Sequence, residues 1–283
     1  TRHDDYTMVK TTKGRPVTKI RLYGYSTSPF VRKVGCCLYY KQLPFEFVPV
    51  DPTNPEQIAF THQAQVPVLQ IDDEWRKDST PLALWLEELF PDQPLFGRNA
   101  QERDLILSMD KWVTESLILS SFRFAHECEM TARFRQTAWR MAAIVSSQTP
   151  LSDEVRNAWP ELLKMAPFIK HMMCDIDQTE SLRDMQLRVA MELLEHIKEG
   201  PYFGGLHQPT LVDFAIYPQL VFNYMVGIEQ HLKIAQIPAL KQWLDNMRQY
   251  LPENPLLVAD FMIVSHLPPS EIEQHSELKV ASG

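Results

Sequence analysis

The first part of the chain alternates short apolar runs with one helical stretch. Residues 19–24 (KIRLYG) alternate polar and apolar side chains, which is typical of a short strand. Residues 29–41 carry apolar side chains at helical spacing, and Pro29 suits the first helical turn because its missing N–H needs no partner there. Residues 45–50 predict a second strand. Strand, helix and strand in this order indicate a parallel crossover.

Two more strands and a second helix follow. Residues 66–71 and 75–77 predict strands separated by the turn Asp72-Asp73-Glu74. Asp78-Ser79 then begins a helix that extends to about residue 90. The order βαβ followed by ββα predicts a thioredoxin-like arrangement, a small mixed sheet with helices on both faces.

The rest of the chain is predicted to be helical. The loop at 91–99 contains two prolines and a glycine and indicates a linker. Apolar residues recur at helical spacing in the ranges 100–125, 133–147, 182–198, 210–227 and 238–250. Residues 151–173 are also predicted to be helical, although Pro160 and Pro167 interrupt them.

The predicted fold class is therefore α/β plus all-α, in two domains, which suits a chain of 283 residues. We expect a flexible segment at 1–17, a thioredoxin-like domain at 18–92, a linker at 93–98, an all-helical domain at 99–265 and a loose tail at 266–283.

Composition narrows the class of protein. The formal net charge of −8, without a basic patch, makes nucleic acid an unexpected partner. The most apolar stretch, 211–228, contains Asp213 and Pro218 and is too polar for a membrane span. The four cysteines form no CxxC pair, and no Cys/His spacing suits a metal. We expect a cytoplasmic protein with reduced thiols, in which Cys36 and Cys37 belong to the core.

Ser28 precedes Pro29 at an N-cap position, beside unpaired backbone N–H groups and the positive end of the helix dipole. Because a free thiol has a pKa of about 8.5, such a site would favour the ionised form of a bound thiol. An ordinary helix cap is the alternative interpretation. Ser26 and Thr27, in the same turn, are the next candidates.

Two further motifs suggest a ligand. Val66-Pro67 precedes a strand, and a cis bond there would turn the Val66 backbone toward an extended ligand, while a trans proline at a strand edge is the ordinary alternative. In Asp78-Ser79, the hydroxyl and the helix-start N–H groups suit a carboxylate and the aspartate suits an ammonium group. An ordinary capped helix is the alternative here.

These motifs, in this order, resemble the N-terminal domain of the cytosolic glutathione transferases. Residues 28–34 (SPFVRKV) are similar to the tau class, and 65–67 (QVP) to the phi and theta classes. In the second half, 203–205 with 210–214 (TLVDF) resemble the family's capping box and hydrophobic staple, and 237–250 resemble its late helix.

The resemblance implies a glutathione transferase that conjugates a glutathione thiolate to a small apolar electrophile. It implies that Ser28 activates the thiol, that the Val66 backbone pairs with the tripeptide, and that Asp78 and Ser79 hold the γ-glutamyl end. The predicted glutathione-binding residues are Ser28, Phe30, Gln65, Val66, Pro67, Asp78 and Ser79. Glutathione is then a cosubstrate, no metal is needed, and a homodimer is expected.

The chain also departs from the family pattern. Thr61-His62-Gln63 stands where Asn-Pro is usual, and no residue clearly matches the basic partner of the glycine carboxylate. Residues 125–180 are longer than the family norm, so the electrophile is left open. Two alternatives stay open as well: a non-catalytic binding or regulatory protein, and a glutathione-dependent lyase, isomerase or dehalogenase. The aromatic residues Trp112, Phe122 and Phe124 either line an apolar pocket or belong to the core.

Overall fold

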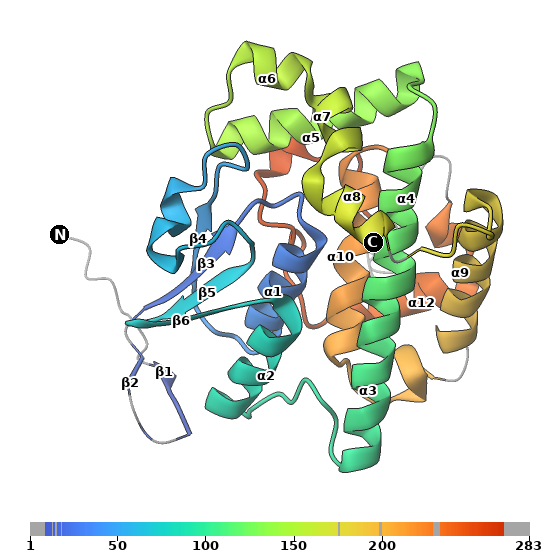
Figure 1. Ribbon diagram of the computed structural model, residues 1–283. Helices are drawn as coiled ribbons and strands as arrows, with labels where there is room; N and C mark the ends of the chain where they lie inside the picture. Colours follow the sequence, from blue (N-terminus) through green and yellow to red (C-terminus); the bar gives the residue numbers. More distant parts are fainter. Residues whose placement is uncertain are drawn as a thin grey trace, which may run out of the picture.

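The structure is a computed structural model that describes residues 9–12, 14, 16–17, 19–174, 176–197, 200–228 and 233–268. The strands are β1 (Val9–Lys10), β2 (Pro16–Val17), β3 (Ile20–Gly24), β4 (Glu46–Pro49), β5 (Val68–Ile71) and β6 (Glu74–Lys77). The helices are α1 (Pro29–Tyr40), α2 (Ser79–Leu89), α3 (Ala100–Trp112), α4 (Leu119–Glu127), α5 (Ala132–Gln148), α6 (Asp153–Asn157), α7 (Trp159–Met165), α8 (Pro167–Met173), α9 (Leu182–Ile197), α10 (Leu211–Met225) and α12 (Pro238–Met247). A sheet with its helices and a helical region lie beside each other (Figure 1).

The main sheet has the strand order β4-β3-β5-β6. Strand β3 pairs parallel with β4 and antiparallel with β5, and β5 pairs antiparallel with β6. With α1 as the crossover and α2 after the last strand, this topology confirms the predicted thioredoxin-like fold class.

Helix α1 joins the sheet to the helical region. It contacts β3 on one side and α10 on the other (Figure 1), and it buries Val31, Val34 and Leu38. Gly24, at the end of β3, permits this close approach, because a Cβ atom there would lie 2.4 Å from the Val31 side chain. The core is therefore continuous from the sheet into the helical region.

The helical region differs in detail from the prediction. The helix predicted at 100–125 is α3 and α4 joined by a π-helix at Val113–Ile118, an irregularity that is frequent at functional sites. The helix predicted at 151–173 is three short helices, because Pro160 and Pro167 each stand in the first turn of a new helix.

The ends of the chain are described only in part. The segment predicted to be flexible contains β1 paired with β2, and the Thr12 N–H donates to Leu89 O at 2.9 Å. Residues 1–8 and 269–283 lie outside the described residues.

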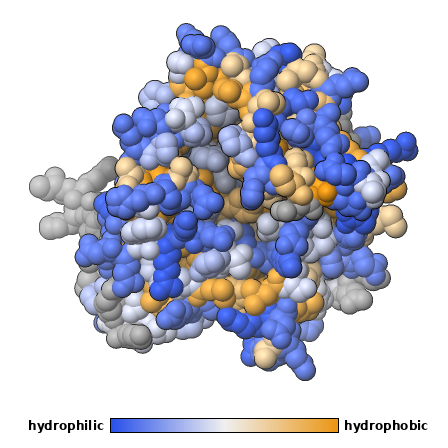
Figure 2. Space-filling view, in the orientation of Figure 1, coloured by the Kyte–Doolittle hydropathy of each residue, from blue (hydrophilic) through white to orange (hydrophobic). Residues whose placement is uncertain are grey.

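Among the helices that the structure does describe, none is long and apolar enough for a membrane crossing. On the face shown in Figure 2, hydrophilic residues predominate and apolar ones form separate patches.

The start of α10 carries the predicted capping box. The Asp213 carboxylate accepts from the Thr210 N–H at 2.8 Å, and the Thr210 hydroxyl accepts from the main-chain N–H of Asp213 in return. The same buried carboxylate accepts from Phe203 N–H at 3.1 Å and Trp243 Nε1 at 2.8 Å. Asp213 thus ties the preceding loop and α12 to the helix against which α1 packs.

A buried ion pair joins the two regions. Lys33 Nζ on α1 lies 2.6 Å from Asp110 Oδ1 on α3, and both side chains are less than 5% exposed (3% and 4%). The Thr80 hydroxyl, in the first turn of α2, donates to Asp110 Oδ2 at 2.6 Å and accepts from Lys33 Nζ at 3.0 Å. We call these three residues the interdomain clasp. Each member satisfies the other two, which a buried charge pair requires.

Asp213 should make stability depend on pH. Burial raises the pKa of Asp213 to about 6 in the folded protein, although the donors around the carboxylate act in the opposite direction. Because the folded-state pKa is above the unfolded one, the stabilising contribution is complete below pH 4 and is lost as the pH rises through 6. The free energy of unfolding of wild type, minus that of Asp213→Asn, should fall by up to about 3 kcal/mol between pH 4 and 7. Urea titrations across this range would measure it, and a constant difference would contradict the expectation.

The clasp should respond to substitution as a coupled unit. Asp110→Asn leaves the buried Lys33 ammonium without its counter-charge, so the free energy of unfolding should fall by about 3–5 kcal/mol. Lys33→Met with Asp110→Leu should recover most of this loss. Lys111→Met is the matched control, because Lys111 pairs with Glu115 on the exposed surface and should cost less than about 0.5 kcal/mol. Chemical denaturation of wild type, Lys33→Met, Asp110→Leu and the double variant would complete the cycle, and additive losses would argue against coupling.

Candidate functional site

Strand register places the three predicted motifs at one end of the sheet. Tyr23 pairs with Val68, and Val68 pairs with Lys77. The end of β3, the start of β5 and the end of β6 therefore lie together. Ser28 follows the end of β3, Asp78 follows the end of β6, and Val66 precedes the start of β5. Residues separated by about fifty positions in sequence thus share one edge.

Ser28 is the N-cap of α1 and is buried. Its Oγ accepts from the Val31 N–H at 3.5 Å, which is long for a hydrogen bond. Within the described residues, the Ser28 hydroxyl donates to no acceptor. It therefore retains a donor for a ligand at the helix start, where the dipole favours negative charge.

The neighbouring serine has a different role. Ser26 Oγ is fully buried and donates to Gln148 Oε1 at 2.8 Å. Gln148 Nε2 in turn donates to Leu257 O at 2.6 Å. Ser26 therefore anchors the β3–α1 loop to α5 and to the segment beyond α12, which leaves Ser28 and Thr27 as the hydroxyls of this turn not used in that way.

The start of α2 presents a free carboxylate. Asp78 is the N-cap residue, is exposed, and makes no side-chain capping bond. Its φ of 71° and ψ of 131° are unfavourable for a residue with a side chain, and such backbone conformations cluster at functional sites. Ser79, next to it, is buried. Thr80 of the interdomain clasp follows directly, and its hydrogen bond to Asp110 holds this turn in place.

The segment before β5 completes the edge. The Val66–Pro67 peptide bond is cis. The main-chain N–H and C=O of Val66 form no hydrogen bond to any described residue. Gln65 is exposed and accepts from Lys77 Nζ at 3.3 Å, and Phe30 is half-buried against the core. The seven predicted residues are therefore arranged around the start of α1, the start of α2 and the approach to β5.

Other predicted candidates contribute to packing, except Phe124, which is exposed. Cys36 and Cys37 are fully buried, and burial raises the pKa of both thiols, that of Cys37 to about 12. Trp112 Nε1 donates to Glu192 on α9 at 2.7 Å. Phe122 packs edge-on against Phe168 of α8. Within the described residues, no cluster of His, Cys, Asp and Glu could hold a metal.

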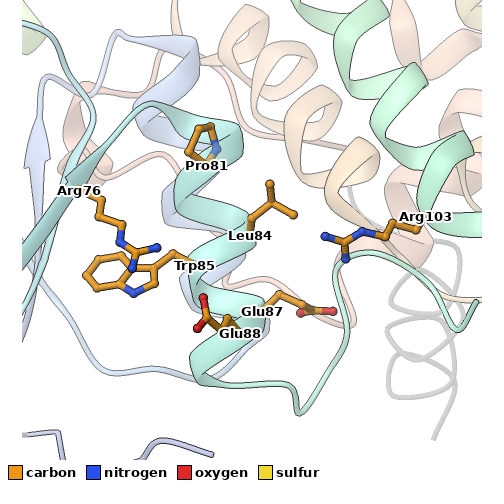
Figure 3. A pocket seen from close by; sticks show the side chains of 7 residues that line it. All are labelled: Arg76, Pro81, Leu84, Trp85, Glu87, Glu88 and Arg103. Carbon is orange, nitrogen blue, oxygen red and sulfur yellow. The ribbon is translucent and has the colours of Figure 1, made fainter. Parts of the chain in front are cut away.

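A pocket lies between α2, the last strand of the sheet and α3. It is lined by Arg76, Pro81, Leu84, Trp85, Glu87, Glu88 and Arg103. Figure 3 shows the α2 side chains between Arg76 and Arg103, which approach from opposite sides. None of the predicted site residues lines this pocket, so it is a separate surface with both signs of charge.

Sequence reasoning missed two buried cations of α1. Lys33 was not linked to Asp110 and Thr80, and Arg32 was not singled out. Arg32 and Lys33 are both almost fully buried. The available signal was two adjacent cations inside an otherwise apolar helical stretch.

Comparison with known proteins gives consistent results. The family model of the glutathione S-transferase N-terminal domain matches residues 22–94. Glutathione S-transferase 1 from Dianthus caryophyllus is 33% identical over 104 residues, which are 35% of this chain and 47% of that protein. The alignment therefore spans less than half of this curated relative.

Two solved structures share the fold over most of their length. A glutathione S-transferase from Rhodospirillum rubrum F11 has a TM-score of 0.55 at 21% identity, covering 88% of this chain and 96% of that one. A maleylacetoacetate isomerase from Anaeromyxobacter dehalogenans 2CP-1, with bound dicarboxyethyl glutathione and citrate, has a TM-score of 0.50 at 18% identity, covering 91% and 96%. Residues 22–94 therefore match the glutathione S-transferase N-terminal domain, and most of the chain shares the fold of these two solved structures.

Proposed function

We propose that this protein is a cytoplasmic glutathione transferase that binds glutathione at the end of the sheet where Ser28, Val66 and Asp78 meet. The observation that carries the proposal is the set of unused hydrogen-bonding groups at this edge. The Ser28 hydroxyl proton, the Val66 main chain and the Asp78 carboxylate have no partners among the described residues. Unpaired polar groups that converge in this way are typical of a ligand site.

Each group fits one part of the tripeptide. The Ser28 hydroxyl and the α1 N-terminus stabilise the thiolate of the cysteinyl part. The Val66 main chain pairs with the backbone of the ligand. Asp78 binds the α-ammonium group of the γ-glutamyl end, and Ser79 with the N–H groups of α2 binds its carboxylate. Phe30, Gln65 and Pro67 form the surrounding surface. The glutathione derivative bound in the isomerase of the same fold supports this choice of ligand.

The reaction is a nucleophilic attack. The glutathione thiol releases its proton to solvent, and the thiolate forms a carbon–sulfur bond with the electrophilic carbon. The leaving group departs with its electron pair, or an adduct takes up a proton from water. The electrophile is small and mostly apolar.

The proposed active form is a homodimer that uses the pocket face of α2 and α3 (Figure 3). A twofold interface requires a self-complementary surface. This face offers exposed Arg76 and Arg103 together with exposed Glu88, around the apolar side chains of Pro81 and Leu84. Opposite charges on the two protomers can therefore pair across the axis.

Ser28→Ala tests the thiol site. The variant loses the donor to the sulfur, so the thiol pKa of bound glutathione should rise by about one to two units and kcat with a chlorodinitrobenzene electrophile should fall about a hundredfold. Thiolate absorbance in the complex and product analysis would measure both. The products also distinguish conjugation from isomerisation, lyase chemistry or dehalogenation.

The control is Ser152→Ala, because Ser152 is also an N-cap serine, on α6, and accepts from the Val155 N–H at 3.2 Å. It should change neither the thiol pKa nor kcat. Absence of glutathione binding to wild type at millimolar concentration would refute the proposed function and favour a non-catalytic protein. An unchanged thiol pKa in Ser28→Ala would reduce Ser28 to a helix cap.

Arg103→Glu tests the homodimer. The reversed charge should repel the glutamates of the second protomer that pair with Arg103 across the axis. The equilibrium should therefore shift toward monomer in sedimentation experiments. Arg183→Glu, an exposed substitution on α9, is the control and should leave the mass unchanged. A monomeric wild type, or a dimer that is unaffected by Arg103→Glu, would place the interface elsewhere or exclude it.

A further inference from the structure

Arg32 is a buried cation one helical turn after Ser28. The residue is only 2% exposed, and its main-chain N–H donates to Ser28 O at 3.2 Å in the first turn of α1. Residues four apart lie on the same face of a helix, and helical side chains lean toward the N-terminus. Arg32 therefore lies on the face of α1 that begins at Ser28, and its guanidinium group contacts α10.

The guanidinium group is only partly satisfied. Nη2 donates to Gln219 Oε1 at 2.8 Å, and the group lies 4.0 Å from the centre of the Phe222 ring. Nε and Nη1 are buried and have no hydrogen-bond partner. Within the described residues, Arg32 forms no ion pair with an Asp or Glu. A buried charge of this kind is costly unless it is paired.

The charge is retained at neutral pH. Burial lowers the pKa of Arg32 to about 9, which still leaves the group protonated at pH 7. The titratable side chain that is electrostatically coupled to Arg32 is Cys36, on the next turn of α1. Burial raises the pKa of that thiol well above its usual value, so Cys36 is neutral. No neighbouring group described in the structure therefore compensates the positive charge.

Gln219 connects this cation to the start of α1. Its Oε1 accepts from Arg32, and its Nε2 donates to Pro29 O at 3.3 Å. Gln219 thus holds the guanidinium beside the first turn, whose carbonyl at Pro29 is next to Ser28. The neighbouring Lys33, by contrast, is neutralised by Asp110. One of the two buried cations of α1 is structural, and the other lacks its anion.

We propose that the missing counter-ion of Arg32 is the anionic sulfur of the bound thiol, so that Arg32 stabilises the thiolate through its field while Ser28 donates the hydrogen bond. This inference rests on the proposed function. The thiol gives its proton to solvent water on ionisation, and the negative charge that remains on sulfur neutralises the buried cation. Arg32 is thus a positioning residue that acts through its charge. It does not need to contact the ligand.

The arrangement has a measurable cost in the free protein. Because the cation is uncompensated without ligand, Arg32→Met should unfold at the same or a higher temperature than ligand-free wild type. In the glutathione complex the same variant should show a thiol pKa higher by about one unit, which is about a tenfold loss of thiolate at neutral pH. Arg32→Lys keeps the charge and should keep the thiol pKa close to that of wild type.

The test titrates thiolate absorbance against pH in complexes of wild type, Arg32→Met and Arg32→Lys, with Arg32→Gln as the second neutral variant in case the methionine variant does not fold. Affinity for S-methylglutathione, whose sulfur cannot ionise, is measured in parallel by calorimetry. A merely structural role would weaken this affinity as well, whereas the proposed role leaves it within about twofold. Arg140→Met is the control, since Arg140 donates to Val226 O at the end of α10 and should not change the thiol pKa.

The outcomes distinguish failure of the Arg32 inference from failure of the proposed function. A raised thiol pKa in the neutral variants, with S-methylglutathione affinity and thermal stability maintained, supports the inference. An unchanged thiol pKa in these variants, or an equal loss of affinity for both ligands, overturns it while the proposed function stands. If wild type binds neither glutathione nor S-methylglutathione, the proposed function fails and the inference fails with it.

Discussion

Helix α1 contacts β3 on one side and α10 on the other, and this double contact requires polar groups to be buried along the helix. The approach on the β3 side depends on Gly24, where no side chain fits against Val31. On the other side, Arg32 and Lys33 enter the boundary between the two regions with their charges. Because buried charges need partners, the positions of Asp110, Thr80 and Gln219 follow from the placement of this helix.

The candidate site is a consequence of the same geometry. The antiparallel pairing of β3, β5 and β6 places three chain turns at one edge, and the start of α1 supplies the positive end of a dipole there. Thr80 connects the clasp to the turn that contains Asp78 and Ser79. The thiol end and the γ-glutamyl end of the proposed ligand site are thus linked through the contacts of the clasp, because Lys33 of α1 donates to Thr80 of α2.

Much of the fold could be predicted from the sequence because it is encoded locally. Alternation predicts the first strand of the sheet and short runs predict the others, and the Thr210 to Asp213 spacing predicts a capping box that the structure confirms. The prolines at 160 and 167 were recognised as interruptions, but their role as first-turn residues of new helices depends on how α7 and α8 pack. Local signals also located Ser28 and Asp78 at helix starts.

The interdomain contacts could not be predicted in this way. Lys33, Thr80 and Asp110 are far apart in the chain, and each alone is typical of an exposed helix surface. The same holds for Arg32, whose burial depends on Gln219 and Phe222 nearly 190 positions later. Only the assembled structure shows which charged residues of α1 lie inside.

The clasp also limits how the sheet and the helical region can separate. A hinge motion that parted the sheet from the helical region would strip the ammonium of Lys33 from its carboxylate before water could replace it. Such an opening is therefore costly, so the clasp favours one relative position of the two regions.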